Sequence, residues 1–136
     1  NPVAVKELLN VEDDYIRKLI AREVILLKNV RHQNCVSWLG VCSYQGSIFL
    51  ITEYVPGGDL RKVLKTETKV PWSLRIKIIV DICAAMTYLH SRKIMHRDLK
   101  SKNVLIESPT FVAKLCDFGF ARIHSMPNEM TVKVGT

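Results

Sequence analysis

The sequence predicts an α+β protein built from two parts, a small antiparallel sheet with one helix and then a mainly helical part. Three observations predict this class. Apolar patterns run in the order strand, helix, strand, strand; a Pro-Gly-Gly break interrupts them at residues 56–58; and helical patterns then continue to a short hairpin. A length of 136 residues fits one domain or a piece of one, and a chain that opens at Asn1 inside an apolar run is expected to start partway through a domain.

The part before the break contains most of the predicted strands. Residues 2–6, which include Val-Ala-Val-Lys, predict the end of a strand. Residues 10–28 repeat apolar side chains at helical spacing and predict a helix. Residues 35–42 and 47–54 predict two more strands, joined through a turn at Tyr44-Gln45-Gly46.

Two helices are predicted after the break. Asp59 suits the N-cap of a short helix over residues 59–65. Pro71 precedes the longest helix, which is predicted over residues 73–91. The residues predicted on its apolar face are Ile79, Ile82, Cys83, Met86, Leu89 and His90.

Shorter apolar segments follow the long helix. Residues 104–106 and 112–116 alternate with charged loops and predict a hairpin. The tail over residues 122–136 is polar, and we expect it to be irregular.

Composition and charge bear on three questions: whether the protein binds nucleic acid, whether it spans a membrane, and whether its cysteines are reduced. The 20 basic and 13 acidic residues give a net charge of +7, but the basic residues are scattered without interleaved aromatic residues, so we expect no nucleic-acid partner. No apolar stretch is long enough to span a bilayer. The four cysteines show no metal-binding spacing, which favours reduced thiols in an intracellular, cytoplasmic protein.

Three short motifs occur in a fixed order along the chain. Val-Ala-Val-Lys at residues 3–6 precedes His-Arg-Asp-Leu-Lys-Ser-Lys-Asn at residues 96–103, and Asp-Phe-Gly follows at residues 117–119. Together they resemble the motifs of the eukaryotic protein kinase domain, and the resemblance extends over the whole chain. It implies the two-lobed α+β kinase fold, here incomplete, and transfer of the γ-phosphate of ATP to a protein hydroxyl.

The resemblance assigns chemical roles that match the needs of phosphoryl transfer. Lys6 would hold the α- and β-phosphates, and Asn103 and Asp117 would bind Mg²⁺ through oxygen atoms. Asp98 would accept or orient the proton of the acceptor hydroxyl, and Lys100 would neutralise the γ-phosphate in transit. The cofactors implied are therefore ATP and Mg²⁺.

Glu23 is informative even without the resemblance. It falls on the apolar face of the first predicted helix, where an unpaired carboxylate would be costly, so we expect a cation beside it. Lys6 is the expected partner, as in the lysine–glutamate pair of kinases. The alternative is a partly exposed surface glutamate at the edge of the apolar stripe.

Residues next to the Pro-Gly-Gly break resemble the kinase hinge. Thr52 would be the gatekeeper, and the backbone of Glu53 and Val55 would bind adenine. Asp59 would reach the ribose hydroxyls, a role compatible with its being an N-cap. The adenine ring would lie between Ala4 and Leu105.

The resemblance also implies regulatory residues. The stacked regulatory spine of kinases would consist of Leu27, Trp38, His96 and Phe118. Arg97 and Arg122 would bind an activating phosphate on Thr131 or, as second candidate, Ser125. The alternative for this last segment is a plain polar surface connection.

The details of residues 40–42, 52–54 and 99–103 look most like the tyrosine-kinase-like group, which implies serine/threonine specificity. The alternatives are dual-specificity or tyrosine kinase activity, and a pseudokinase, scaffold or binding module.

The expected partners are a protein substrate and an upstream activating kinase or a trans-autophosphorylating copy. Residues 1–55 would belong to the N-lobe, 56–58 to the junction and 59–136 to the C-lobe. A glycine-rich loop and an Ala-Pro-Glu motif do not occur in the chain, so by itself it is expected to be inactive.

Overall fold

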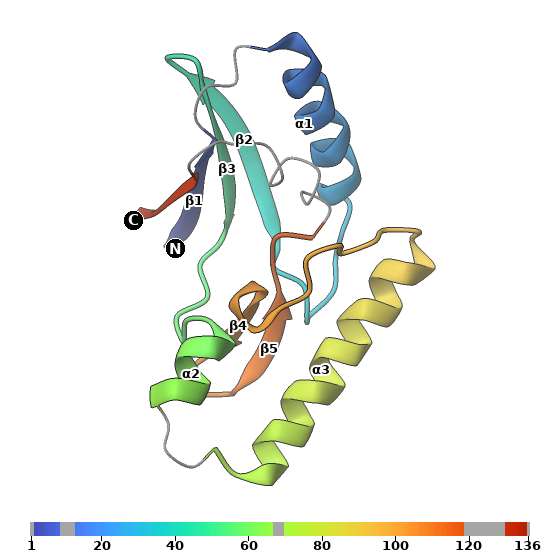
Figure 1. Cartoon of the computed structure of the whole chain (residues 1–136), viewed down its shortest axis with the longest axis vertical. Coiled ribbons are helices and arrows are strands. Elements are labelled where there is room, and N and C mark those ends of the chain that lie inside the picture. The colour runs from blue at the N-terminus through green and yellow to red at the C-terminus, as the bar shows by residue number, and fades with distance from the viewer. Residues whose placement is uncertain (1, 9–12, 67–69, 119–129, 136) are drawn as a thin grey trace. The chain divides into compact units, whose positions relative to one another are not determined.

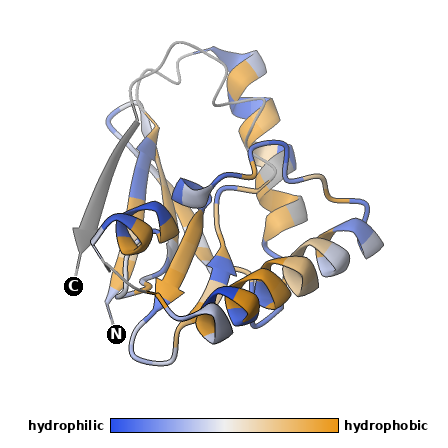
Figure 2. Ribbon diagram, turned by 60° about the horizontal axis from the view of Figure 1, so that its bottom comes forward, coloured by the Kyte–Doolittle hydropathy of each residue, from blue (hydrophilic) through white to orange (hydrophobic). Residues whose placement is uncertain are grey.

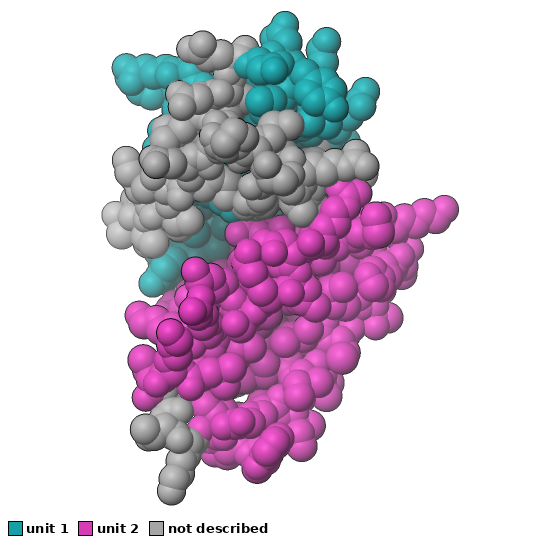
Figure 3. Space-filling view, viewed as in Figure 1, with its two compact units in different colours: residues 1–30, 37–54, 119–136 teal, residues 31–36, 55–118 magenta. Residues whose placement is uncertain are grey.

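The computed structural model describes residues 2–8, 13–66, 70–118 and 130–135. The chain divides into two compact units (Figure 3). Unit 1 draws on residues 1–30, 37–54 and 119–136, and unit 2 on residues 31–36 and 55–118. No helix within the described ranges has the length and apolar character needed to cross a membrane.

Unit 1 is a four-stranded antiparallel sheet together with one helix (Figure 1). In chain order its elements are β1 (Val3–Leu8), α1 (Asp14–Leu27), β2 (Trp38–Tyr44), β3 (Ser47–Glu53) and β6 (Met130–Gly135). The strands lie in the order β2-β3-β1-β6. The predicted first strand, helix and strand pair of this part are therefore confirmed as elements, although their ends differ from the expected ones.

The beginning of β2 shows why one strand boundary was predicted wrongly. The strand was expected from residue 35, but β2 begins at Trp38. Cys35 instead forms an isolated parallel bridge with Leu115 and belongs to unit 2. Residues 35–42 are mostly apolar on both sides of the boundary between the two units, so their pattern gives no sign of that boundary. β2 and β3 are joined by a two-residue turn at Gln45-Gly46, with positive φ at both positions as in a type I′ hairpin.

Helix α1 begins at a side-chain cap. The Oδ1 atom of Asp13 accepts a hydrogen bond from the backbone N–H of Tyr15 at 2.7 Å. This satisfies one of the donors that the first turn of a helix leaves unpaired. Ile20 and Leu27 supply the buried side of the helix. The predicted start at residue 10 lies among residues 9–12, outside the described residues.

The end of the chain was predicted wrongly. Residues 122–136 were expected to be irregular, but β6 (Met130–Gly135) pairs with β1 along its whole length, from Val3 opposite Gly135 to Leu8 opposite Met130. Valine alternates with polar residues over 131–134, which suits a strand, but the segment is short and its backbone partners come from β1, far back in the chain. Residues 119–129 and 136 lie outside the described residues.

Unit 2 combines two helices with a hairpin (Figure 1). Its elements are α2 (Leu60–Thr66), α3 (Trp72–Ser91), a 3-10 turn (Ser101–Asn103), β4 (Val104–Glu107) and β5 (Val112–Leu115). β4 and β5 are antiparallel, with Val104 opposite Leu115, so the predicted hairpin is confirmed. Residues 34–36 run along the outer edge of β5, where the N–H of Val36 donates to the carbonyl of Leu115 at 2.9 Å.

The buried face of α3 differs from the predicted one. Ile78, Ala85 and Leu89 are buried. Leu89 agrees with the prediction, whereas Ile79 is 56% exposed and Cys83 and His90 are also exposed. Residues 76–86, in the middle of the helix, are apolar except for Lys77 and Asp81 (Figure 2), so periodicity alone did not identify the side that packs against the hairpin.

The two glycines of the break are required by close packing against β4. The carbonyl of Gly58 accepts a hydrogen bond from the N–H of Ile106 at 2.8 Å, and Gly58 has a φ of 75°. A Cβ atom at Gly57 would overlap the backbone carbonyl of Ile106. Backbone, unlike the end of a flexible side chain, does not move aside at low cost.

We therefore expect Gly57→Ala to destabilise the protein by about 1–3 kcal/mol, because the added methyl group forces the break away from Ile106. Gly40→Ala is the control, since a Cβ there meets nothing within 4 Å, and it should stay within about 0.5 kcal/mol of wild type. Urea unfolding of both variants measures the difference. Equal stabilities for the two variants would contradict the close approach at Gly57.

Candidate active site

Three of the predicted catalytic residues form a hydrogen-bonded cluster after α3. The Nδ2 atom of Asn103 donates to the backbone carbonyl of Asp98 at 2.8 Å and to its Oδ2 atom at 2.9 Å. The Nζ atom of Lys100 lies 2.7 Å from the same Oδ2. Asn103 is buried, whereas the side chain of Lys100 is about half exposed, so the amide is the more firmly held partner.

The backbone at the two ends of this region adopts an unusual conformation. Arg97 has a φ of 65° and Asp117 has a φ of 57°, both in the left-handed region that non-glycine residues rarely occupy. Each such residue costs on the order of 1 kcal/mol or more and persists where the surrounding structure enforces it. Two of the five described non-glycine residues with positive φ thus lie next to Asp98 and at Asp117, among the predicted catalytic and metal-binding residues.

The predicted metal ligands lie at the open end of the β4–β5 hairpin. Asn103 directly precedes β4, and Asp117 follows β5 after one intervening residue. Val104 is opposite Leu115 in the hairpin, and the N–H of Cys116 donates to the carbonyl of Asn103 at 3.0 Å. A carboxylate and an amide oxygen are the donor types that suit Mg²⁺, which commonly takes one or two protein ligands besides water and phosphate oxygens. Within the described ranges no group of three His, Cys, Asp or Glu residues could form a dedicated metal cage. The carboxylate of Asp117 and the amide of Asn103 are donors of the kind that hold a Mg²⁺ ion which also binds phosphate oxygens.

His96 connects the predicted catalytic loop, residues 96–103, to Phe118. Its buried ring meets the Phe118 ring edge-on, with centroids 6.3 Å apart and an interplanar angle of 62°. The Nδ1 atom accepts a hydrogen bond from the N–H of Asp98 at 3.3 Å. Burial lowers the pKa of His96, and backbone hydrogen bonding at Cys116 and the charges of Asp98 and Asp117 offset part of that shift. His96 is therefore held neutral.

This depressed pKa predicts a specific loss of stability in acid. The unfolded chain protonates His96 near pH 6.5 and the folded chain only at lower pH, so the stabilisation is complete above 6.5 and is lost as the pH falls below it. Over that range one proton contributes a slope of up to about 1.4 kcal/mol per pH unit. Urea unfolding at a series of pH values should show a shallower slope for His96→Phe than for wild type. His90→Gln, at an exposed position, should keep the wild-type slope, and identical slopes for all three proteins would contradict the assignment.

The residues predicted to hold the nucleotide from the small sheet share one face of it. Ala4 is directly opposite Thr52 in the β1–β3 pair, and Lys6 lies two residues further along β1. Alternate residues of a strand project to the same face, so these three residues lie on one side of the sheet. Glu23 lies in α1, but its side chain is outside the described part of the structure, so its ion pair with Lys6 stays a prediction.

Glu53 has a structural role that sequence reasoning missed. Its Oε1 atom accepts a hydrogen bond from the N–H of Ser37 at 2.7 Å, and its own N–H donates to the carbonyl of Ser37 at 3.0 Å. The hydroxyl of Thr52 donates to the carbonyl of Glu53 at 3.3 Å. Glu53 therefore connects the end of β3 to the residue before β2 through two hydrogen bonds. Val55, the other predicted adenine contact, is buried in unit 2.

Two predicted nucleotide contacts lie together in unit 2. Asp59 and Leu105 form an isolated antiparallel bridge. The Oδ1 atom of Asp59 accepts a hydrogen bond from the N–H of Lys62 at 2.9 Å, so the predicted N-cap is confirmed. The backbone pairing with β4 fixes the position of the carboxylate that was also predicted to reach the ribose.

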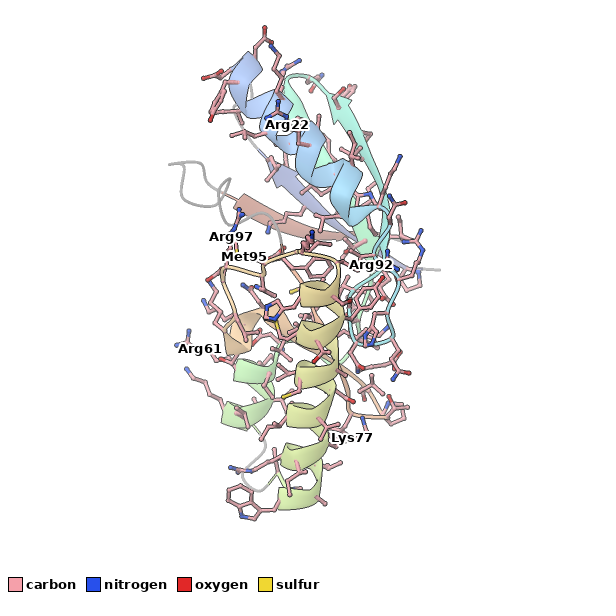
Figure 4. All side chains as sticks on the ribbon, turned by 90° about the vertical axis from the view of Figure 1, so that its right-hand side faces the viewer. Arg22, Arg61, Lys77, Arg92, Met95 and Arg97 are labelled. Carbon is pink, nitrogen blue, oxygen red and sulfur yellow. The ribbon has the colours of Figure 1, made fainter. Side chains whose placement is uncertain are left out.

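The predicted regulatory residues are only partly described. Leu27 is buried in unit 1 and Trp38 is half-buried there, while His96 and Phe118 contact each other in unit 2. Arg97 is exposed (Figure 4). The backbone of Thr131 lies in β6, opposite Glu7 of β1. Arg122 and Ser125 fall outside the described residues.

Comparison with known proteins identifies the family. The family model described as "Protein kinase domain" matches residues 1–136. The chain is 43% identical over 121 residues to a RasGEF domain-containing serine/threonine-protein kinase X of Dictyostelium discoideum, covering 89% of this chain and 12% of that protein. It is 40% identical over 138 residues to a probable serine/threonine-protein kinase kinX of the same organism, covering 98% of this chain and 12% of that protein.

A plant protein is also similar. Serine/threonine-protein kinase STY46 of Arabidopsis thaliana is 37% identical over 127 residues, covering 91% of this chain and 22% of that protein. The chain thus spans less than a quarter of the length of each of these three relatives. The match over the whole chain, together with an antiparallel sheet followed by helices and the β4–β5 hairpin, confirms the predicted kinase fold class. The chain belongs to the protein kinase domain family.

Proposed function

We propose that this chain forms part of the catalytic core of a serine/threonine protein kinase that transfers the γ-phosphate of ATP to a hydroxyl of a protein substrate. The observation that carries the proposal is the position of the Asp98 carboxylate, held by the amide of Asn103 at 2.9 Å and the ammonium of Lys100 at 2.7 Å. A carboxylate fixed by two donors is suited to orient a hydroxyl group and to accept its proton.

In the proposed reaction, the substrate hydroxyl oxygen forms a bond to the γ-phosphorus as the bond between that phosphorus and the leaving oxygen of ADP breaks. The hydroxyl proton passes to Asp98. Lys100, whose ammonium lies against the same carboxylate, would place its positive charge where the phosphoryl group moves. Phosphoryl transfer depends mainly on positioning and charge neutralisation, which this cluster is suited to supply.

ATP and Mg²⁺ are the proposed cofactors, as is general for protein kinase domains. Asn103 and Asp117 would hold Mg²⁺ through their side-chain oxygens, and the bound ion would neutralise phosphate charge. Lys6, paired with Glu23, would bind the α- and β-phosphates. The remaining nucleotide contacts would come from Ala4, Thr52, Glu53, Val55, Asp59 and Leu105. The shared face of Ala4, Lys6 and Thr52 and the pairing of Asp59 with Leu105 support this assignment.

The proposed acceptor is serine or threonine. Two observations support this choice: Lys100 is present in the catalytic loop, and the relatives are named serine/threonine-protein kinases.

We further propose that residues 1–55 belong to the N-lobe, residues 56–58 to the junction between the lobes, and residues 59–136 to the C-lobe. Control by a phosphate on Thr131 or Ser125, bound by Arg97 and Arg122, remains part of the proposal. The phosphate would come from an upstream kinase or a second copy.

A transfer assay on the full-length protein tests this function. The protein is incubated with ATP labelled in the γ-phosphate and a mixed protein acceptor, with and without Mg²⁺, and the labelled acceptor is hydrolysed to its phosphoamino acids. We expect Mg²⁺-dependent phosphoserine and phosphothreonine. Phosphotyrosine would instead support the tyrosine-kinase alternative. Nucleotide binding without any transfer would support a pseudokinase or scaffold.

A further inference from the structure

The strand that leads to Asp117, β5, is held along its outer edge by groups from α3 and from Asn34. The N–H of Ala113 donates to the Oδ2 atom of Asp81 on α3 at 2.9 Å, and the carbonyl of Ala113 accepts from Nδ2 of Asn34 at 2.9 Å. Two residues further along β5, Leu115 donates to the backbone carbonyl of Asn34 at 2.8 Å. An edge that β4 leaves open is thereby closed, and β5 has fixed partners on both sides.

Asp81 is itself fixed by a neighbour one helical turn earlier. The Nζ atom of Lys77, labelled on α3 in Figure 4, lies 3.0 Å from Oδ2 of Asp81 and donates to the carbonyl of Phe111 at 3.3 Å. The side chain of Asp81 is 15% exposed, so its bonds are largely shielded from water. Lys77 and Asp81 thus join α3 both to the turn before β5 and to the first residues of β5.

The far end of the same strand adjoins the proposed metal ligands. Residues 114–116, the first two of which belong to β5, separate the Asp81 contact at Ala113 from Asp117. The N–H of Cys116 donates to the carbonyl of Asn103 at 3.0 Å. Because β4 begins directly after Asn103, a shift of β5 relative to β4 would change the separation of Asp117 from Asn103. Misplacement of such groups by about 1 Å can cost on the order of 100-fold in activity.

We propose that Asp81, supported by Lys77, is a positioning residue. It holds β5 in place and thereby keeps Asp117 at the distance from Asn103 that a metal-bound nucleotide requires. This inference rests on the proposed kinase function, because it assumes that Asn103 and Asp117 hold the metal. Asp81 touches neither substrate nor metal in this assignment. It acts through the backbone of Ala113, as outer groups that orient metal ligands commonly do.

The experiment compares three variants of the full-length protein. Asp81→Ala removes both the Ala113 and Lys77 contacts, and Asp81→Asn keeps the shape but loses the charge. Tyr88→Phe is the matched control, because it also removes an acceptor on α3 for a backbone N–H, but that N–H belongs to Arg31, at 3.0 Å, and not to a residue of β5. Urea unfolding measures the stability of each variant, so that loss of folding is recognised.

The first readout is Mn²⁺ affinity in the presence of a non-hydrolysable ATP analogue, measured by electron paramagnetic resonance. We expect Asp81→Ala to weaken Mn²⁺ binding by about 10-fold or more, Asp81→Asn by less, and Tyr88→Phe to match wild type. The second readout is amide hydrogen exchange without nucleotide, which should be faster over residues 113–117 in Asp81→Ala only.

The outcomes separate this inference from the function on which it rests. If wild type binds Mn²⁺ with nucleotide and Asp81→Ala binds equally well while folded, Asp81 is only structural and the inference fails. A Tyr88→Phe variant that weakens Mn²⁺ as much as Asp81→Ala would also overturn it. If wild type transfers no phosphate yet shows the expected Mn²⁺ differences, the kinase function fails and the positioning role stands. If wild type shows no nucleotide-dependent Mn²⁺ binding, both fail.

Discussion

Asp98→Asn is expected to lower phosphoryl transfer by about a thousandfold while changing the affinity for ATP little. The substitution keeps the size of the side chain, so Asn103 still finds an acceptor for its Nδ2 atom, but the amide cannot take the hydroxyl proton. The proposed nucleotide and metal contacts lie on other residues and are unchanged. Steady-state transfer from ATP and equilibrium binding of a fluorescent ATP analogue measure the two quantities.

The control for Asp98→Asn is Lys102→Met, which removes an exposed charge two residues after Lys100. It should retain transfer within about twofold of wild type, because surface charges away from the reacting groups contribute little. An Asp98→Asn variant that keeps most of its turnover would show that Asp98 is not the proton acceptor. Loss of ATP affinity in parallel with turnover would place Asp98 in nucleotide binding instead.

Ile78→Ala and Ile79→Ala should differ strongly in stability although the two isoleucines are adjacent on α3. Ile78 is 3% exposed and Ile79 is 56% exposed. Truncating the buried residue removes apolar contacts and leaves a cavity, at a cost of about 2–5 kcal/mol. Truncating the exposed residue should cost less than about 1 kcal/mol, because most of that side chain already meets water and alanine favours the helix.

Urea unfolding of the two alanine variants side by side measures this difference, and each serves as the control for the other. The comparison also distinguishes the observed packing of α3 from the face predicted by periodicity, on which Ile79 was inward. A larger loss for Ile79→Ala than for Ile78→Ala would contradict the observed orientation of the helix.

Local signals were enough to predict most elements of the fold. The capping carboxylate of Asp59, the Gln45-Gly46 turn and the hairpin over residues 104–116 each depend on residues close together in sequence. The face of α3 depends on which surface the hairpin covers, and a helix that is apolar nearly all round carries no local sign of that choice. Strand β6 depends on pairing with β1 far back in the chain, so its propensity alone was insufficient.

In the candidate site, too, the local motif was predicted correctly and the contacts between distant parts of the chain were not. The motif predicted that Asp98, Lys100 and Asn103 act together, and the structure places them within hydrogen-bonding or ion-pair distance. Sequence reasoning missed Asn34 and Asp81, the side chains that hold β5 in place. Asp81 did leave a signal, since a carboxylate inside an apolar helix needs a partner. One partner, Lys77, lies four residues earlier and could be found from helical spacing. The other partner is the backbone N–H of Ala113, and a backbone group cannot be identified from a sequence pattern.

The most direct test of the central claim follows the phosphate itself. The full-length protein is incubated with Mg²⁺ and a protein acceptor in two parallel reactions, one with ATP labelled at the γ-phosphate and one with ATP labelled at the α-phosphate. The account predicts that label from the γ-position becomes covalently bound to serine or threonine of the acceptor and that label from the α-position does not. Acceptor labelled from the α-position, or unlabelled in both reactions, would contradict it.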